Sequence, residues 1–344
     1  MNVVGVGIIG VGVMGAAHAR LIATAVPGAR VAAVYDPDPE RAGDLATEVG
    51  ATVVRSAQEL IASPAVTAVI VAAPDPSHEE LTSSCVAAGK PTLCEKPLAV
   101  TSEGTRRVVE AELAAGRRLV QVGFMRRYDP GFAELRRVVA DEEFGVVRLV
   151  HCLHRNAQAH PDATSEGVVS NSMIHELDQV PWLLGSPISA ITVSAPRAGK
   201  AEGDLLDTQV AVLEAESGAM ATVEVSLNAG YGYDVQCEVV GERGTARLAA
   251  PYGILVREAA RDARPVTSDW VGRFAEAYRL ELVAWVGSIR DGRPTGPSAW
   301  DGHLATLVAE AGVRSLRGGG RVGVEAGEAP ALYQSERQGQ GTGT

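Results

Sequence analysis

The chain has 344 residues, which is more than a single hydrophobic core usually holds, so we expect two domains. Its 46% hydrophobic and 21% charged residues are ordinary for globular proteins. The formal net charge is −11 and no basic block interrupts the chain. Nucleic acid is therefore not an expected partner, because phosphate binding needs clustered lysine and arginine.

Compartment and membrane association can also be estimated from the sequence. No apolar stretch reaches the roughly 18–20 residues of a membrane span, and the N-terminus lacks the basic region of a signal peptide. The four cysteines show no CxxC spacing, which favours buried, reduced thiols: Cys85, Cys94, Cys152 and Cys237. These features predict a cytoplasmic protein with no membrane partner.

Short apolar runs alternate with helical patterns through the first 120 residues. Candidate strands are 3–10, 29–36, 51–54, 66–74, 91–97 and 118–124, and candidate helices are 15–25, 39–48, 78–88 and 102–115. This alternation predicts an α/β domain, a doubly wound parallel sheet of the Rossmann type, over residues 1–123. The strands are apolar on both faces, as expected when helices cover both sides of a sheet.

The first strand is followed by GVGVMGAAHA, in which Gly10, Gly12 and Gly15 form a G-x-G-x-x-G pattern. The first glycine allows a tight turn, the second lets a pyrophosphate approach the backbone, and the third permits close helix packing. Asp36 ends the second strand, where an acid accepts a hydrogen bond from the adenosine ribose 2′-OH. Acids and prolines follow it and the first arginine is Arg41, so we expect no cation close to Asp36 and NAD as the cofactor rather than NADP.

Further cofactor-binding candidates come from the same region. Met14 lies within the glycine-rich segment, and Pro74 and His78 lie in APDPSHEE after the fourth strand. Loops at the carboxyl ends of parallel strands face the cofactor crevice, so His78 is a candidate contact to the ribose or nicotinamide. The alternative is that His78 only occupies the first turn of a helix. Glu95 and Lys96 end the fifth strand at the same edge.

The pattern changes after residue 124. Candidate strands 146–153, 208–215, 218–227, 234–240 and 244–250 follow one another with tight turns, and helices are expected near 130–140, 171–184, 272–290 and 301–316. Polar and apolar residues alternate in 222–227, which gives one wet and one buried face. We expect a C-terminal α+β domain, 124–333, with a large, mainly antiparallel sheet, and a disordered polar tail, 334–344.

The Rossmann N-terminus, the EKP motif at 95–97 and the antiparallel sheet together resemble the glucose–fructose oxidoreductase/inositol dehydrogenase (Gfo/Idh/MocA) family. The segments VGFMRRYDPGF, MIHELD and YGYDVQCEVVGERG resemble its myo-inositol dehydrogenase branch. The resemblance extends from Val4 to about residue 325. It implies oxidation of a secondary alcohol, with Lys96 as hydrogen-bond donor, often beside a cis X-Pro bond, and His175 as general base.

Substrate-binding candidates follow from position. Met125 and Arg126 come directly after the sixth strand. Tyr231 and Tyr233 are two residues apart, so in a strand they would share one face. Asn156 is a weaker candidate. His151, His154 and His160 lie around it in the sequence, but no second ligand cluster accompanies them, so we expect no metal.

Asn171 departs from the family pattern. Inositol dehydrogenases usually carry aspartate one helical turn before the catalytic histidine, and an amide can bond a hydroxyl but holds no charge beside His175. The expected reaction is NAD-dependent oxidation of myo-inositol to 2-keto-myo-inositol (scyllo-inosose). Open alternatives are a dehydrogenase or ketoreductase acting on another inositol isomer, a sugar or an aminocyclitol precursor, and a non-catalytic NAD(H)-sensing regulator. Family members commonly form tetramers or dimers, so a homo-oligomer is expected.

Overall fold

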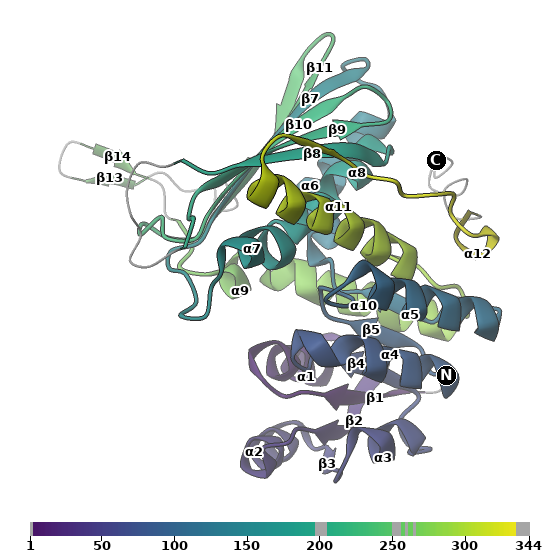
Figure 1. The fold of residues 1–344 in the computed structure, drawn as a ribbon. Helices are drawn as coiled ribbons and strands as arrows, with labels where there is room; N and C mark the ends of the chain where they lie inside the picture. Colours follow the sequence, from purple (N-terminus) through teal and green to yellow (C-terminus); the bar gives the residue numbers. More distant parts are fainter. Residues whose placement is uncertain (1–2, 197–204, 250–255, 259–260, 264–265, 335–344) are drawn as a thin grey trace. The chain divides into compact units, whose positions relative to one another are not determined.

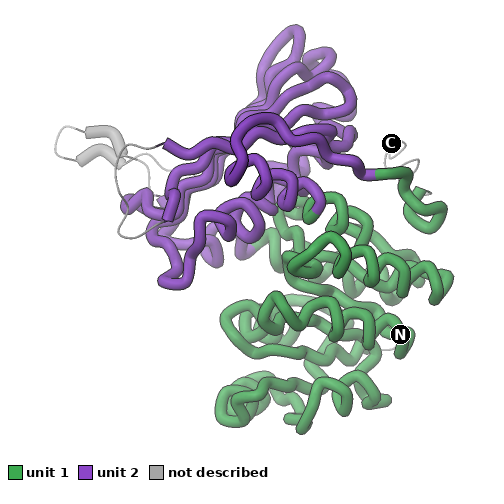
Figure 2. The backbone as a smooth tube through the Cα atoms, in the orientation of Figure 1, with its two compact units in different colours: residues 1–128, 276–306, 327–344 green, residues 129–275, 307–326 purple. Residues whose placement is uncertain are grey.

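The computed structural model describes residues 3–196, 205–249, 256–258, 261–263 and 266–334. All of the expected tail except Gln334 lies outside these ranges. The chain forms two compact units, coloured separately in Figure 2. The first contains residues 1–128, 276–306 and 327–344, and the second contains 129–275 and 307–326.

A six-stranded parallel sheet forms the centre of the first unit (Figure 1). In spatial order its strands are β3 (Thr52–Val53), β2 (Ala29–Tyr35), β1 (Val4–Ile9), β4 (Ala68–Val71), β5 (Thr92–Cys94) and β6 (Val120–Val122). The order 3-2-1-4-5-6 is the doubly wound Rossmann topology. The predicted fold and all six predicted strands are confirmed.

The helices of this unit are α1 (Val13–Ala25), α2 (Pro39–Val49), α3 (Ala57–Ala62), α4 (His78–Ala87), α5 (Ser102–Ala115) and α12 (Ala331–Gln334), with short helical turns η1 (Asp75–Ser77) and η2 (Met125–Tyr128).

Strand β1 shows why both faces of the sheet are apolar. Val6 and Ile8 are fully buried in the core with Ala19 and Ile22 of α1. On the other face a Cβ on Gly7 would lie 2.5 Å from Leu60 of α3, so glycine allows that helix to pack closely.

Helix α10 (Ala275–Asp291) belongs almost entirely to the first unit although it is distant in sequence. Leu282, Trp285 and Val286 are buried in the same core cluster as β1 and α1. The first compact unit therefore combines residues from both contiguous segments that the sequence predicts as domains. The physical reason is that these apolar side chains complete the core on one face of the parallel sheet.

The second unit contains a seven-stranded sheet. Its spatial order is β12 (Thr245–Arg247), β11 (Asp234–Gly241), β7 (Val147–Arg155), β10 (Met220–Ser226), β9 (Gln209–Ala215), β8 (Ile188–Ser194) and β15 (Arg321–Gly323). All neighbours are antiparallel except β10 and β7. The mainly antiparallel sheet is confirmed, while β8 and β15 were not expected.

The predicted alternation along β10 holds except at its end: Val223 and Val225 are fully buried and Glu224 is partly exposed, but Ser226 is also buried. Helices of this unit are α6 (Pro130–Ala140), α7 (Ser165–Gly167), α8 (Ile174–Leu184) and α9 (Trp270–Arg273), with a π-helical turn, η3 (Val168–Ser172). Helix α11 (Ala299–Gly318) contributes its second part, and β13 (Val256–Glu258) pairs with β14 (Arg261–Ala263). A Cβ on Gly312 of α11 would meet Val169 and Ile191, which places α11 against the inner face of the sheet.

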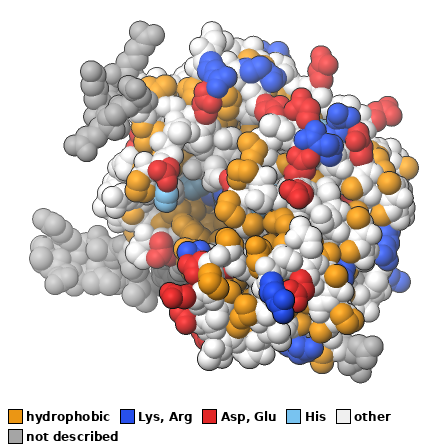
Figure 3. Space-filling model, turned by 60° about the horizontal axis from the view of Figure 1, so that its bottom comes forward, with side chains coloured by type: hydrophobic (Ala, Val, Ile, Leu, Met, Phe, Trp, Pro, Cys, Tyr) orange, Lys and Arg blue, Asp and Glu red, His pale blue; other side chains and the backbone are white. Residues whose placement is uncertain are grey.

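Charged side chains are dispersed over the surface. On the face drawn in Figure 3, lysine and arginine lie among aspartate and glutamate, and the described residues form no continuous basic patch there. No helix within the described ranges is both long and apolar enough to cross a membrane. The same part of the chain contains no group of three or more His, Cys, Asp or Glu side chains arranged to hold a metal ion.

Candidate active site

The glycine turn between β1 and α1 has the geometry that a dinucleotide requires. Gly10 has φ +86° and a Cβ there would lie 2.5 Å from the carbonyl oxygen of Ala72. A Cβ on Gly15 would lie 1.8 Å from the oxygen of Gly10. A Cβ on Gly12, by contrast, would meet no atom of the described residues within 4 Å, and Gly12 precedes α1 as an N-cap residue without a side-chain cap. The first-turn N–H groups of α1 are therefore accessible to a pyrophosphate.

Asp36 follows β2 and its carboxylate is ordered by the backbone. One oxygen accepts from the N–H of Val11 at 2.8 Å and the other from the N–H of Asp38 at 3.0 Å. Each oxygen keeps a second lone pair that can accept from a ribose hydroxyl. Asp36 thus joins the glycine turn to the ribose position, as NAD requires.

The expectation that no cation lies near Asp36 is wrong. Nη1 of Arg41 lies 3.6 Å from Oδ1 of Asp36. The cause is local: Asp38 caps α2, Pro39 begins the helix, and the first turn brings the arginine back toward the end of β2. The Arg41 side chain is 53% exposed and is paired with the carboxylates of Asp36 and Asp38. Asp36 therefore remains the group that can bind the ribose.

The turn after β5 carries Lys96, which is partly exposed. The Lys96–Pro97 peptide bond is cis, as the resemblance implied. Glu95, which is 7% exposed, fixes the turn with both carboxylate oxygens. Oε1 lies 2.6 Å from Nε2 of His18, and Oε2 accepts from the backbone N–H of Lys96 at 3.3 Å.

The charge of Glu95 is maintained in spite of its burial. Burial opposes ionisation, but the hydrogen bond and charge of His18, followed by the charges of Lys96 and His78, hold the pKa of Glu95 below its ordinary value. Glu95 is thus the anionic centre beneath the lysine turn. His18 was not predicted, because its only sequence signal is a histidine within the apolar face of α1.

His78 lies in the first turn of a helix, as the alternative interpretation of its position predicts. It is the first residue of α4 and is 1% exposed. Its Nδ1 lies 2.7 Å from the carbonyl oxygen of Pro97 and its Nε2 lies 2.7 Å from that of Ala73. Both ring nitrogens are engaged with the backbone, so the ring has no polar atom left for ribose or nicotinamide.

The remaining first-unit candidates lie near the carboxyl edge of the parallel sheet or just after it. Met14 lies in the first turn of α1 and is partly exposed, and Pro74 is exposed after β4. Met125 and Arg126 lie in η2, directly after β6, and are 2% and 1% exposed. Their predicted contacts to cofactor and substrate remain predictions.

In the second unit, His175 lies in the first turn of α8 and is 9% exposed. The expected continuous α-helix from 171 to 184 is wrong at its start: residues 168–172 form a π-helical turn that contains Asn171, and α8 begins at Ile174. Single π turns within helices are frequent at functional sites. Asn171 is exposed, and it remains about one turn before His175.

A buried polar cluster lies beside His175. The His154 ring is 6.3 Å from the His175 ring and 5.7 Å from the Tyr233 ring, edge to face in both cases. Nδ1 of His154 lies 3.2 Å from Oε2 of Glu176, and its Nε2 lies 3.5 Å from the Tyr233 hydroxyl. Tyr233 was predicted at the site, whereas Glu176 was not.

The prediction that Tyr231 and Tyr233 share one face is wrong. Gly232 between them has φ +139°, and β11 begins only at Asp234, so the two-residue alternation of a strand does not apply. Tyr233 is 5% exposed beside His154. Tyr231 is 50% exposed; its hydroxyl donates to Asp234 and accepts from Arg155.

Asn156 is a better substrate-binding candidate than its sequence signal suggested. It directly follows β7, where its N–H donates to the oxygen of Ser226 at 2.8 Å and its oxygen accepts from Ala229 at 2.9 Å. Within the described residues its buried Oδ1 has no hydrogen-bond partner. A fixed amide oxygen of this kind can accept from a polyol hydroxyl.

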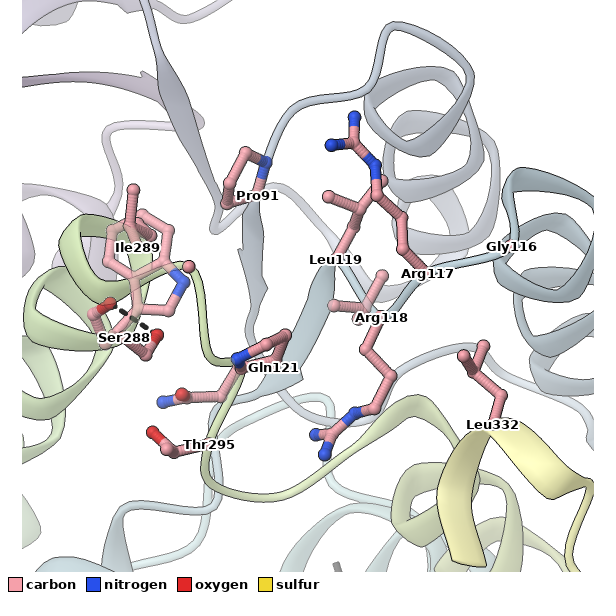
Figure 4. A pocket seen from close by; sticks show the side chains of 14 residues that line it. Pro91, Gly116, Arg117, Arg118, Leu119, Gln121, Ser288, Ile289, Thr295 and Leu332 are labelled. Atoms are coloured by element: carbon pink, nitrogen blue, oxygen red, sulfur yellow. Dashed lines mark hydrogen bonds between the residues drawn. The ribbon is translucent and has the colours of Figure 1, made fainter. Parts of the chain in front are cut away.

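A cavity of about 460 Å³ in the first unit is not part of this site (Figure 4). It is lined by Pro91 and Leu119, which precede β5 and β6, and by residues of α10 and the segment after it. These positions are at the amino ends of the parallel strands, the edge opposite the glycine turn. Arg118 at its wall donates to the oxygen of Gly296 at 3.3 Å.

Comparison with protein families gives two matches that together cover most of the chain. A family model described as "Oxidoreductase family, NAD-binding Rossmann fold" matches residues 4–124. The corresponding "Oxidoreductase family, C-terminal alpha/beta domain" matches residues 136–324. NAD is therefore the cofactor for which the glycine turn and Asp36 are arranged.

The chain is 48% identical over 331 residues to inositol 2-dehydrogenase 1 of Saccharopolyspora erythraea, which covers 95% of this chain and 98% of that protein. It is 42% identical over 332 residues to inositol 2-dehydrogenase of Burkholderia cenocepacia, with 96% and 98% covered. Among solved structures, it is similar to myo-inositol dehydrogenase from Lactobacillus casei in complex with NAD(H) and myo-inositol. That similarity has a TM-score of 0.93 and 34% identity, with 96% of this chain and 100% of that chain covered.

Proposed function

The chain belongs to the Gfo/Idh/MocA family of NAD-binding oxidoreductases, and from this premise we propose that it oxidises a secondary hydroxyl of a cyclic polyol. The proposed reaction converts myo-inositol and NAD to 2-keto-myo-inositol (scyllo-inosose), NADH and a proton. Relatives at 42–48% identity that carry the name inositol 2-dehydrogenase support this substrate class.

In this proposal Lys96 and His175 have different roles in the reaction. Bound NAD supplies the hydride acceptor. The Lys96 ammonium donates a hydrogen bond to the reacting oxygen and stabilises the negative charge that develops there. The neutral imidazole of His175 accepts the hydroxyl proton as general base, a role suited to the imidazole group, whose unperturbed pKa is about 6.5.

The observation that carries the proposal is the fixed lysine turn. Lys96 follows β5 at the same sheet edge as Gly10, Gly12 and Asp36, and a buried carboxylate orders its backbone N–H. A surface lysine would not require this buried support. In the second unit, the proposed hydroxyl-binding groups are Asn156, whose amide oxygen has no hydrogen-bond partner among the described residues, and Tyr233 beside His154.

The proposal also includes the number of subunits and the cellular compartment. Val210 and Met220 are 41% and 42% exposed on neighbouring strands of the second sheet, on the face opposite α11. We propose that a second copy of the chain covers this face, and that the protein is cytoplasmic. Light scattering after size exclusion measures the number of subunits, and a monomer would contradict the assembly.

The direct test is NADH absorbance at 340 nm with myo-inositol, scyllo-inositol, chiro-inositol and glucose, each with NAD and with NADP. The proposal predicts turnover of myo-inositol with NAD above the other combinations. Turnover of only another isomer or a sugar would assign the enzyme a different substrate. Asn171, in place of the usual aspartate, is the residue that would explain such a change. Tight NAD binding without turnover of any polyol would favour a non-catalytic NAD(H) sensor.

A further inference from the structure

The imidazole of His78 joins two backbone segments of the first unit. Ala73 lies in the loop after β4, and Pro97 lies in the turn after β5, next to Lys96. The His78 ring lies between their carbonyl oxygens, with one nitrogen 2.7 Å from each. At 1% exposure, the ring is almost completely shielded from solvent.

The number of protons on the ring follows from this geometry. A carbonyl oxygen only accepts hydrogen bonds, and a neutral imidazole carries a single N–H. A neutral ring would direct a lone pair at one of the two oxygens at 2.7 Å and leave that buried acceptor unpaired. Only the imidazolium, with an N–H on each nitrogen, satisfies both contacts.

The surroundings of His78 support a positive charge. Burial opposes it, but the sulfur of Cys94 and the two carbonyl oxygens outweigh burial and raise the pKa of His78 to about 10. The Glu95 carboxylate, which is kept ionised in part by the charge of His78, supplies the nearby negative charge. Glu79, next to His78 on α4, is paired with Arg107 of α5 instead.

We propose that His78 is a permanently protonated positioning residue that fastens the Lys96 turn to the loop after β4. This loop contains Pro74, a predicted cofactor contact, so the bridge sets the position of the lysine relative to the cofactor side of the sheet. The effect on catalysis rests on the proposed role of Lys96, whereas the protonation state does not. His78 neither accepts the substrate proton nor titrates between pH 6 and 9.

The protonation state is tested without cofactor or polyol, on protein labelled with ¹⁵N in its histidine rings. At pH 8 we expect a ring with two N–H signals that disappears in His78→Gln and in His78→Phe. The glutamine variant, which keeps one donor and has a similar reach, supplies the assignment if the phenylalanine variant is unstable. A single N–H or none assigned to His78 at pH 8 would overturn the proposal, whatever the enzyme oxidises.

The positioning role is tested by kinetics of His78→Gln. A displacement of the lysine by about 1 Å is expected to lower kcat by roughly 10–100-fold, with the Kd for NAD within about threefold of wild type. The acid limb of its kcat/KM profile should stay at the wild-type pH. The matched control is His303→Gln, another buried histidine of this unit, bonded to Thr105 at 2.8 Å.

The kcat of the control His303→Gln should stay within about threefold of wild type. A general loss of packing would lower the kcat of both variants, so a loss confined to His78→Gln indicates positioning. An unchanged kcat in His78→Gln, or an acid limb that moves with it, would overturn the positioning role. If the wild type oxidises no polyol, the proposed function fails, while the two N–H signals still decide whether His78 bridges the loops as a cation.

Discussion

His18 and Glu95 form a buried pair, with Nε2 of His18 2.6 Å from Oε1 of Glu95. His18 comes from α1, the helix that follows the glycine turn, and Glu95 directly precedes Lys96. The pair therefore ties the dinucleotide-binding helix to the turn that carries the proposed donor. The Tyr278 ring of α10 packs edge-on against His18, with ring centroids 5.8 Å apart, so the late helix α10 also supports this pair.

Glu281, on the same helix as Tyr278, is predicted to lower the stability of the folded protein at neutral pH. It is 0% exposed, and neither carboxylate oxygen has a hydrogen-bond partner within the described residues. Burial, followed by the negative charge of Glu95, raises the pKa of Glu281 well above its ordinary value. Above about pH 4.5 the unfolded chain releases this proton while the folded protein retains it, so stability falls as pH rises toward the folded pKa.

We therefore expect Glu281→Gln to stabilise the protein more at pH 8 than at pH 5, by about 1–3 kcal/mol. Urea unfolding at the two pH values measures this difference. Glu276→Gln, an exposed carboxylate on the same helix, is the control and should show no such gain. An equal effect of Glu281→Gln at both pH values would mean that the carboxyl does not keep its proton in the fold.

Lys96→Ala should remove the hydrogen-bond donor to the reacting oxygen and leave the dinucleotide site intact. We expect kcat to fall by roughly 10²–10⁴-fold, the range for loss of a polar group that acts in the transition state. NAD affinity, measured by calorimetry, should change by less than about threefold. Lys96→Arg keeps the charge with a different geometry and should rescue only part of the activity. More than a third of wild-type kcat in Lys96→Ala would remove the residue from the mechanism.

Asp36→Ser should weaken NAD binding and improve NADP relative to NAD. The carboxylate accepts from a 2′-OH and repels a 2′-phosphate, and loss of a charged hydrogen bond corresponds to about 10–150-fold in affinity. Arg41, now 3.6 Å from Asp36, would then face the 2′-phosphate. Adding Arg41→Ala to Asp36→Ser should abolish the gain in NADP binding. A wild type that already prefers NADP would contradict the role of Asp36.

The parallel sheet could be predicted because its determinants are local. Apolar strands, the glycine pattern and Asp36 occur in a fixed order, and each requires a particular backbone conformation or burial. The packing of helix α10 with the N-terminal core was not predicted, because amphipathic periodicity shows that a helix buries a face but not which core receives it. Trp285 and Leu282 complete the N-terminal core, and this is decided only by tertiary packing.

The sequence predicts a set of site residues but not their contacts. The resemblance implies roles for Lys96 and His175, but it could not show that His78 faces two carbonyls or that Glu281 lies near Glu95. Those contacts join segments far apart in sequence. The error at Tyr231 has a local cause, since a two-residue period holds only within a strand and Gly232 precedes β11.

Asn171→Asp tests the alignment of the proposed base most directly. Asn171 lies in the π-helical turn, about one turn before His175. A carboxylate there would stabilise the imidazolium and raise the pKa of His175, since an opposite charge within about 4–6 Å favours the charged form. The base must be neutral to accept a proton, so a raised pKa moves the acid limb of kcat/KM to higher pH. A carboxylate also cannot donate a hydrogen bond, as an amide does, so relative rates on myo- and scyllo-inositol should change as well.

Asn171→Ala is the matched control: it should alter the isomer ratio but leave the acid limb in place, because it adds no charge. If Asn171→Asp leaves both the acid limb and the isomer ratio unchanged, residue 171 does not face the reacting hydroxyl, and His175 would lose its assignment as the base next to it.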